Sequence, residues 1–595
     1  MEVAQSCCTL HQGHTYKLRP LNPGNSRKLF LKRIFGSEEG CPSDLSEVCD
    51  DILKKCDGLP LAIIAIAGLL AGKAPTVDEW NKVQCSFGHA LERHSDVNRM
   101  IQILSLSYFD LPLHLRSCLL YLSIFPEDCV IGKDRLILRW IAEGFVHEEH
   151  GFTQYEVGER CFNELTNRSL IQPVNSGFSV FFCRVHDTIL EFILSKALEE
   201  NFVTLFDVPN IRVDPHRKIR RLSLQDRNEV SDALVGLWEK RTYYHARSVS
   251  VFPGSLDGLP SLQKFKHLRV LDLEDCEGLQ AHHLTHLGGL FALRYLSFRD
   301  TRIDELPEEI GELQYLQTLD VRCTDIRKLP SSVGRLARLA TLLCDPVVQL
   351  RDGFGKNMQA LQQLEDINVS KQSASFAQEL RQLRNLRTLE VMIDDEVSED
   401  LVSSLCTLAM EPHPLGLKIL KILRIVVPRV PRWIGSLDNL QDLTLFVEQL
   451  GVADFGLLGS LNALSSLVLW VTIEVADRSS SSDGTQQVKI NGSHGFPSLR
   501  WFDVGSQFCA FGLLFEAGAM PKLHELDLRF DMDKTGSLTE GEFDFGIQHL
   551  TCLALVRWYL GYFRFREEEP EHPAWDGLKK AVSSHLNHPR MYCLL

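Results

Sequence analysis

The sequence LRYLSF at Leu293–Phe298 returns 23 residues later as LQTLDV at Leu316–Val321, and after another 23 residues as LATL at Leu339–Leu342. Similar LxxLxL cores begin at Leu268, Leu364, Leu386, Leu420, Leu440, Leu464, Leu499, Leu523 and Leu550. A hydrophobic core that returns every ~20–29 residues is typical of a solenoid in which each copy is one short strand with a turn behind it. We therefore predict a leucine-rich-repeat domain from about residue 220 onward.

The leucines of each predicted strand point into the solenoid, so the residues between them point outward along its concave face. Aromatic and arginine side chains on such a face are typical of protein-binding hot spots. The candidate partner-binding residues in these positions are Tyr295, Arg299, Asp320, Arg322, Phe446, Trp470, Trp501 and Arg529. The alternative for Trp470 and Trp501 is that they only pack against the neighbouring turns.

The residues before the repeats have a helical pattern. Asp44–Cys56 spaces its apolar residues along one helical face, with Ser43 as the expected N-cap. Gly58 is the expected stop after this helix and Pro60 the expected first residue of the next one. The same pattern predicts helices at 100–108, 113–125, 134–146 and 188–199, and alternation predicts a strand at 178–184.

Composition restricts the class of protein. At 595 residues the chain is long enough for two to four domains, and its net charge of −15 argues against a general nucleic-acid binder. The N-terminus shows no secretion signal, and the longest apolar stretch, Leu59–Ala71, is too short to span a bilayer. The 17 cysteines show no paired spacing, which favours reduced thiols in a cytosolic protein.

Several segments ahead of the repeats resemble the motifs of a single protein family. Cys56–Ala62 (CDGLPLA) resembles a GLPLA motif, and Val185–Asp187 (VHD) lies where that family has Met-His-Asp. Cys118–Asp128 (CLLYLSIFPED) and Leu138–Phe145 (LRWIAEGF) resemble two further motifs in family order, and Tyr16–Leu21 resembles a more N-terminal one. The chain thus resembles the plant nucleotide-binding (NB-ARC) leucine-rich-repeat, or NLR, disease resistance proteins.

The resemblance implies an α+β multidomain fold: helical and winged-helix NB-ARC subdomains followed by an α/β leucine-rich-repeat solenoid. The implied limits are 1–19 for a remnant of the nucleotide-binding subdomain, 20–108 for the helical subdomain, 109–205 for the winged-helix subdomain and 206–595 for the repeats.

The resemblance also implies a nucleotide contact. Pro60 would lie against the adenine and His186 would reach the β-phosphate of ADP, with Gly58, Leu59, Leu61 and Asp187 supporting the two motifs. The sequence departs from the family because it contains no G-x-x-x-x-G-K-[ST] phosphate loop. We therefore expect an N-terminally truncated chain that binds ADP or ATP weakly or not at all and is not an enzyme.

The function implied is that of an immune receptor without enzymatic activity, in the cytoplasm, with the nucleus as the alternative compartment. Its repeats would recognise a pathogen effector, a guarded host protein or another NLR, and no nucleic acid or membrane span is expected. The alternatives are a repeat-containing substrate adaptor of a ubiquitin ligase and a regulatory or non-signalling fragment.

One acidic segment resembles a different kind of site. Asp531–Glu542 (DMDKTGSLTEGE) fits the spacing of an EF-hand calcium loop, but a repeat strand rather than a helix precedes it. We therefore expect an acidic loop between repeats there and no metal site, and a loop around the serine run Ser479–Ser482.

Overall fold

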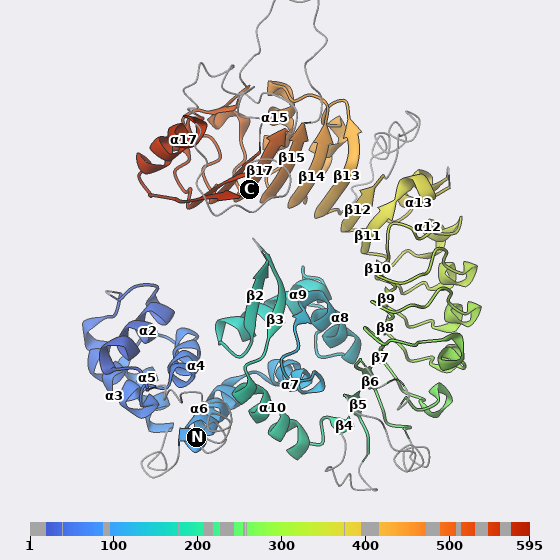
Figure 1. Cartoon of the computed structure of the whole chain (residues 1–595), viewed down its shortest axis with the longest axis horizontal. Coiled ribbons are helices and arrows are strands. Elements are labelled where there is room, and N and C mark those ends of the chain that lie inside the picture. Colours follow the sequence, from blue (N-terminus) through green and yellow to red (C-terminus); the bar gives the residue numbers. More distant parts are fainter. Residues whose placement is uncertain are drawn as a thin grey trace, which may run out of the picture. The chain divides into compact units, whose positions relative to one another are not determined.

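The structure is a computed structural model that describes residues 19–594, except 39, 87–95, 177–178, 207–217, 226–242, 254–255, 257–258, 374, 394–415, 472–487, 507–512, 530–544 and 560–572. The chain divides into two compact units (Figure 1). The first holds the residues up to Leu259 together with His267–Leu271, and the second holds Pro260–Lys266 together with the residues from Asp272 onward. The start of the Tyr16–Leu21 motif, the serine run and the EF-hand-like segment lie outside the described residues.

The first unit begins with a group of helices. These are α2 (Pro23–Phe35), α3 (Ser46–Cys56), α4 (Pro60–Ala71), α5 (Val77–Ser86) and α6 (Asp96–Asp110). Helix α2 begins after Asn22, whose side chain accepts a hydrogen bond from the Asn25 N–H, and it ends at Gly36 in the left-handed conformation. Helix α4 is apolar on most sides, and eight of its residues are therefore buried.

The helix predicted at Asp44–Cys56 is confirmed, but the prediction that Ser43 caps it is wrong. Ser43–Leu45 form a short 3-10 turn (η1), and no side chain caps either η1 or α3. Ser43 lies inside this turn and Leu45 is the N-cap residue of α3, so the Ser43 hydroxyl does not accept from the first free N–H groups of that helix.

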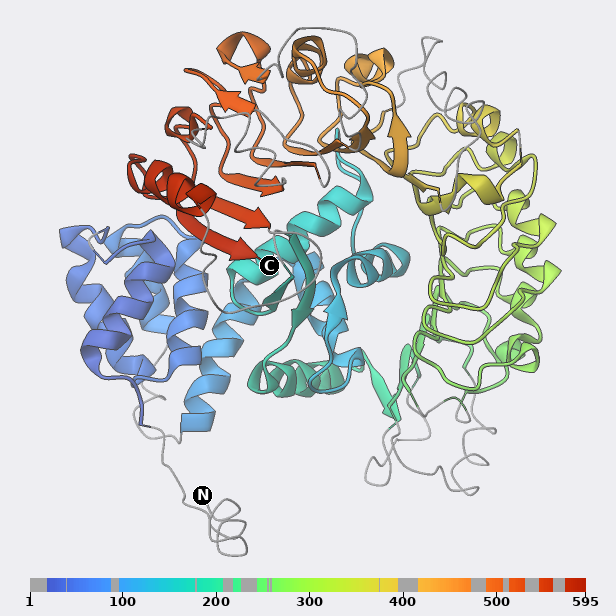
Figure 2. The same cartoon turned by 45° about the horizontal axis from the view of Figure 1, so that its top comes forward.

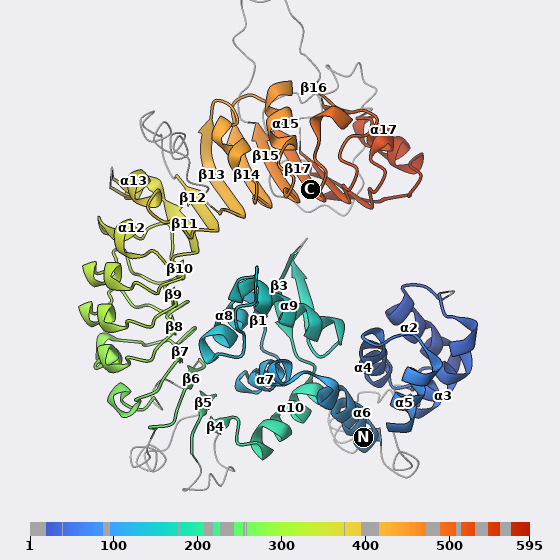
Figure 3. The same cartoon turned by 180° about the vertical axis from the view of Figure 1, so that it is seen from behind.

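The second part of the first unit is a winged helix. It contains α7 (Leu113–Tyr121), η3 (Leu122–Ile124), β1 (Ile131–Gly132), α8 (Lys133–Glu143), α9 (Gln154–Asn167), β2 (Gln172–Ser176), β3 (Ser179–Arg184) and α10 (Asp187–Glu199). Strand β3 lies between β1 and β2 in an antiparallel sheet, and the β2–β3 hairpin forms the wing (Figure 3). The strand predicted at 178–184 and the helix predicted at 188–199 are confirmed.

Three parallel strands follow the winged helix within the same compact unit. They are β4 (Thr204–Phe206), β5 (Arg221–Leu224) and β6 (Ser248–Val251), and β5 pairs with both neighbours. Strand β7 (Val270–Asp272) lies at the division between the units. The first unit therefore continues past residue 205, the limit implied by the family resemblance.

The second unit is a curved stack of repeats, with its parallel strands on the inner side and short helices on the outer side (Figures 1 and 2). The inner strands are β8 (Tyr295–Ser297), β9 (Thr318–Asp320), β10 (Thr341–Leu343), β11 (Gln363–Asn368), β12 (Thr388–Met392), β13 (Ile419–Val427), β14 (Asp442–Val447), β15 (Ser466–Val471), β17 (Trp501–Ser506), β19 (Glu525–Arg529), β20 (Leu555–Tyr559) and β21 (Arg590–Leu594). The outer helices include α12 (Phe354–Asn357), α13 (Phe376–Leu380), α15 (Val452–Gly459) and α17 (Pro573–Ser583). The predicted α/β repeat solenoid is confirmed.

Strand pairing shows where the leucine pattern was placed correctly. Leu296, Leu319 and Leu342 are matched in register on β8, β9 and β10, and all three are buried. These leucines occupy the fourth position of LxxLxL, as the 23-residue step predicts.

Three of the predicted repeat starts are wrong by three residues. Leu364 pairs with Leu342 and Leu420 pairs with Leu389, so both occupy the fourth position of their cores rather than the first. Those cores begin at Leu361 and Leu417. The last core begins at Leu553 instead of Leu550, because Val556 pairs with Leu526.

The part of the chain that the structure describes contains no candidate membrane span. No helix there combines the length and the apolar character needed to cross a bilayer.

Candidate functional site

The GLPLA segment forms a tight joint between α3 and α4. Asp57 and Gly58 both have positive φ, Leu59 is extended, and Pro60 is the first residue of α4. The Leu21 N–H donates to the Gly58 carbonyl at 2.9 Å, and a Cβ at Gly58 would lie 2.4 Å from the Leu21 carbonyl oxygen. Only glycine fits this position without displacing the backbone. Pro60 itself is exposed and Leu61 is half-buried.

His186 is the N-cap of α10, directly after strand β3. Its Nδ1 accepts a hydrogen bond from the Thr188 N–H at 3.3 Å, and its backbone carbonyl accepts from Ile189 and Leu190. Because Nδ1 acts as an acceptor, the neutral ring carries its proton on Nε2, which is then a donor. The His186 and Asp187 side chains are exposed, whereas Val185 packs against the core.

The two motifs are separate in the described structure, where no hydrogen bond or ring contact joins Pro60 to His186. Each has a complete local role, Pro60 in starting α4 and His186 in capping α10. The exposed Nε2–H of His186 suits a phosphate oxygen, and the exposed ring of Pro60 suits a flat apolar group. Their role toward a nucleotide stays a prediction.

A buried polar network that the sequence analysis did not identify joins the winged helix to the first strands. The Arg139 side chain on α8 is fully buried and donates to the Tyr121 hydroxyl at 3.0 Å and to the Ser250 hydroxyl. One turn later, Glu143 accepts two hydrogen bonds from Arg221 of β5, at 3.0 and 2.9 Å. Burial raises the pKa of the Tyr121 hydroxyl, so it remains protonated.

The first half of the inner repeat face holds its charges in local pairs. Arg322 donates to both carboxylate oxygens of Asp320, at 3.0 and 2.7 Å, and Arg299 lies 3.2 Å from Asp300. Tyr295 and Asp320 are buried, at 1% and 3% exposed. The expectation that these two candidates are exposed is therefore wrong, whereas Arg299 and Arg322 remain partly exposed.

The second half of the inner face carries an aromatic and arginine cluster. The rings of Phe446 and Trp470 stack with centroids 5.8 Å apart. The Arg529 guanidinium lies 5.2 Å from the Trp470 ring centroid and 3.7 Å from that of Tyr559, and it pairs with Asp503 through two 3.0 Å hydrogen bonds. We call Phe446, Trp470, Arg529 and Tyr559 the aromatic–arginine row, because their Cα atoms share one register across β14 to β20.

Gly505 is the reason Arg529 reaches Trp470. It is the residue in the same register between these two side chains, and a Cβ there would lie 2.6 Å from the Arg529 Cβ. The absence of a side chain leaves space over β17, which the guanidinium crosses to meet the indole. A glycine between two large residues of the same register was the available sequence signal for this contact.

Trp501 and Asp527 lie beside this row. The Trp501 Nε1–H donates to Asp527 at 3.3 Å, and Arg557 donates to Asp527 at 3.2 Å. Burial, together with the neighbouring charge of Asp503, raises the pKa of Asp527 to about 7.

Trp470 and Trp501 both contact side chains of neighbouring turns, Trp470 by stacking on Phe446 and Trp501 by its hydrogen bond to Asp527. Both tryptophans remain partly exposed. Tyr559, Asp503, Asp527 and Arg557 were missed because their lateral partners cannot be identified from the repeat pattern alone.

Within the described ranges, no three or more His, Cys, Asp or Glu side chains form a group that could hold a metal ion. The EF-hand-like segment Asp531–Glu542 lies outside those ranges, so its calcium binding is untested.

Comparisons with known proteins match both parts of the chain. A family model described as a leucine-rich repeat region matches residues 245–591, and one described as the winged helix domain of disease resistance proteins matches residues 124–193. Disease resistance protein RGA5 of Oryza sativa subsp. japonica is 30% identical over 98% of this chain and 54% of its own length. Disease resistance protein Pik-2 of the same organism is 31% identical over 89% of this chain and 59% of its own length.

A third relative covers a shorter segment. Disease resistance RPP13-like protein 4 of Arabidopsis thaliana is 39% identical over 32% of this chain and 23% of its own length. The chain spans about half the length of the rice relatives that it matches. The two domain matches and these relatives agree with the motif order and with the described fold. The chain therefore belongs to the leucine-rich-repeat proteins and, within them, to the plant NLR disease resistance family.

Proposed function

We propose that this chain is the recognition part of a plant immune receptor, acting inside the cell without enzymatic activity. The inner face of its repeats binds a protein: a pathogen effector, a host protein modified by one, or a second NLR. The observation that carries this proposal is the aromatic–arginine row on β14 to β20.

The row has the properties of a binding hot spot. Its aromatic and arginine side chains are the types that dominate binding energy at protein interfaces. Ring stacking and the Arg529–Asp503 pair already hold these side chains in place, so little conformational entropy is lost when a partner arrives. The Arg529 side chain is 28% exposed, which leaves part of it accessible to a partner.

The partner test compares two double variants in plant tissue. Phe446→Ala with Trp470→Ala removes the aromatic end of the row. Phe291→Ala with Tyr315→Ala removes two exposed aromatic side chains that lie outside the strands, at 62% and 47% exposed. Each tagged chain is purified from leaves challenged with a pathogen, and the retained proteins are identified by mass spectrometry and then measured by surface plasmon resonance.

We expect a partner that binds the wild type and the Phe291/Tyr315 variant equally and the Phe446/Trp470 variant at least ~10-fold more weakly, because hot-spot truncations cost about 2 kcal/mol or more. Resistance in the plant should follow the same order. Equal binding by both variants, with equal protein levels, would reject the inner face as the recognition surface. A partner set dominated by ubiquitin-ligase scaffold subunits would favour the adaptor function instead.

We also propose that Pro60 and His186 contribute an adenine and a phosphate contact, and that this chain alone holds ADP or ATP weakly. The chain has no phosphate loop to supply backbone N–H groups and a lysine for the phosphates. Calorimetry of the purified chain with ADP tests this, with His186→Ala as the variant. Micromolar binding that His186→Ala leaves unchanged would contradict both the weak affinity and the role of His186.

A further inference from the structure

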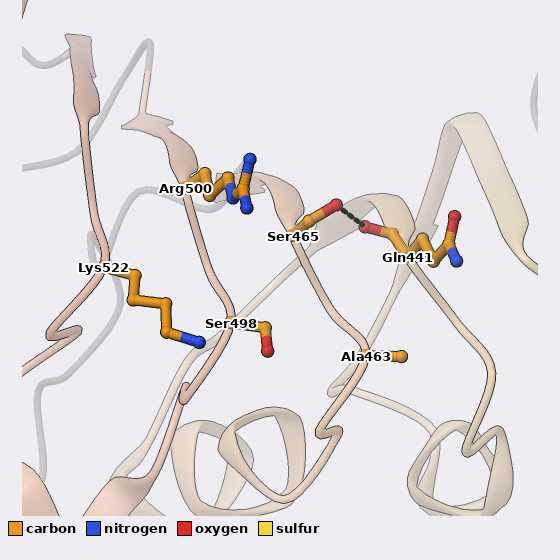
Figure 4. Close-up of a pocket in the computed structure, with 6 residues that line it drawn as sticks. All are labelled: Gln441, Ala463, Ser465, Ser498, Arg500 and Lys522. Carbon is orange, nitrogen blue, oxygen red and sulfur yellow. Dashed lines mark hydrogen bonds between the residues drawn. The ribbon is translucent and has the colours of Figure 1, made fainter. Parts of the chain in front are cut away.

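A polar groove lies on the edge of the repeats, next to the inner face rather than on it. We call it the edge groove and define it by Gln441, Ala463, Ser465, Ser498, Arg500 and Lys522 (Figure 4). Gln441, Ser465 and Arg500 directly precede strands β14, β15 and β17, and the other three lie in the turns just before β15, β17 and β19. Its volume is about 280 Å³.

The backbone of the groove is held firmly. The Ser465 and Ser466 N–H groups both donate to the Gln441 carbonyl at 2.9 Å, and the Arg500 N–H donates to the Ser465 carbonyl at 2.8 Å. The His524 N–H continues the series by donating to the Arg500 carbonyl at 2.8 Å. Side chains on successive turns are therefore presented at fixed spacing, so the groove exists before any ligand arrives.

The chemistry of the groove is that of an anion site. Arg500 and Lys522 lie on neighbouring turns, with their charged ends directed toward Ser465 and Ser498 (Figure 4). No carboxylate lines the groove, and neither cation forms an ion pair with any residue that the structure describes. The cations of the inner face differ, because Arg529 pairs with Asp503 and Arg557 pairs with Asp527 and Glu525. Within the described residues, two positive charges without an ion-pair partner therefore line one groove of a chain whose net charge is −15.

The size and openness of the groove indicate which anion fits. Pockets that enclose whole small molecules are typically ~300–1,000 Å³, so this groove holds a single group and leaves the rest of its ligand outside. Arginine and lysine together offer more N–H donors than the two oxygens of one carboxylate can accept. A phosphate monoester has three acceptor oxygens and close to two negative charges, which match both cations and the Ser498 hydroxyl.

We infer that the edge groove binds a phosphorylated serine or threonine of a peptide or protein segment. The phosphate lies between Arg500 and Lys522, and the peptide chain runs along the open edge of the repeats. This site is separate from the aromatic–arginine row, so the result of its test does not depend on the recognition function proposed above.

Calorimetry on the purified full chain tests the inference with four probes: a short peptide with one phosphoserine, its unphosphorylated form, its glutamate counterpart and inorganic phosphate. The variant is Arg500→Gln with Lys522→Gln. The matched control is Lys356→Gln with Arg384→Gln, which removes the same charge from two exposed side chains elsewhere in the repeats. Circular dichroism checks that all three proteins are folded.

We expect the phosphoserine peptide to bind the wild type and the control equally, and the Arg500/Lys522 variant at least tenfold more weakly. The glutamate and unphosphorylated peptides should bind the wild type at least tenfold more weakly than the phosphoserine peptide. Unchanged affinity in the Arg500/Lys522 variant, or no binding to the wild type, would overturn the site. Inorganic phosphate that binds as tightly as the peptide would overturn the assignment to a peptide ligand.

Discussion

Arg221 and Glu143 form a two-hydrogen-bond ion pair between strand β5 and helix α8, although 78 residues separate them in the sequence. Their side chains are 6% and 0% exposed. The Arg221 guanidinium also lies over the Phe202 ring, 3.9 Å from its centroid, and the Glu143 backbone carbonyl accepts a hydrogen bond from Arg269. The winged helix and the first repeat strands are thus joined by charge as well as by apolar packing.

Removing one partner of this pair should destabilise the first unit. Glu143→Gln leaves a buried guanidinium without its counter-charge, and such losses cost about 3–5 kcal/mol. The double change Glu143→Leu with Arg221→Met should cost much less, because no unpaired charge remains. Urea unfolding, monitored by circular dichroism, measures the stability of both variants. The control is Asp51→Asn, which breaks the exposed Lys54–Asp51 pair and should leave the urea midpoint unchanged. Equal losses of unfolding free energy in the single and the double variant would contradict this account.

Gly58→Ala should destabilise the helical group by about 2 kcal/mol or more, because it adds both a positive-φ strain and a contact 2.4 Å from the Leu21 carbonyl oxygen. Gly36→Ala provides a matched comparison, since Gly36 has a similar φ of 75° but nothing within 4 Å of the added Cβ. It should cost only about 1 kcal/mol. Thermal unfolding distinguishes the two, and equal shifts in midpoint would show that the close approach to Leu21 does not matter.

Gly505→Ala should disturb the aromatic–arginine row. The new methyl group meets the Arg529 Cβ and backbone, and overpacking of this kind typically costs about 1–3 kcal/mol. Gly456→Ala, on helix α15 with nothing within 4 Å of the added Cβ, should instead stabilise the repeats by about 0.5–1 kcal/mol. Denaturant unfolding checks the opposite signs. If Gly505→Ala is neutral, Arg529 does not need the space over β17.

The raised pKa of Asp527 predicts a pH dependence. The folded protein holds this proton up to a pKa of about 7, whereas the unfolded chain releases it near the ordinary aspartate value of 3.8. The folded state therefore binds more protons between these pH values, and the contribution of Asp527 to stability falls as pH rises from about 4 to about 7.

Asp527→Asn should remove this slope while keeping an acceptor for Trp501. Urea unfolding at several pH values between 5 and 8 measures the free energy of unfolding of both proteins. The difference between them should change in favour of the variant as pH rises. Parallel curves would mean that Asp527 is ionised in the folded protein throughout this range.

Most of the repeat architecture could be predicted because one period governs it. The 23-residue step placed Leu296, Leu319 and Leu342 correctly, since each is the buried centre of a strand. The misplaced starts at Leu364 and Leu420 have a physical reason: a leucine also lies three residues before each of them, at Leu361 and Leu417, so the apolar pattern admits two registers. Only the pairing with the neighbouring strand decides between them.

The candidate sites were predictable only to the extent that one strand or one motif defines them. The repeat period placed Phe446, Trp470, Trp501 and Arg529 on the inner strands, but the contact of Arg529 with Trp470 depends on the missing side chain of Gly505 on the one strand between them. Arg139 and Glu143 lie within the Leu138–Phe145 motif, but their burial was not predicted, because charged residues four apart on a helix normally face solvent. Their burial results from strands β5 and β6, which lack the full leucine pattern.

The position of β4, β5 and β6 in the first compact unit has a practical consequence for hybrid proteins that exchange repeats between relatives. A junction at residue 206 would supply Glu143 from one parent and Arg221 from the other, and would force the foreign strands to fit a core that they did not evolve with. A junction between β6 and β8 would keep that core within one parent. The part of this protein that can be exchanged as a unit thus begins some 50 residues later than the limit at residue 206 that the family resemblance implies.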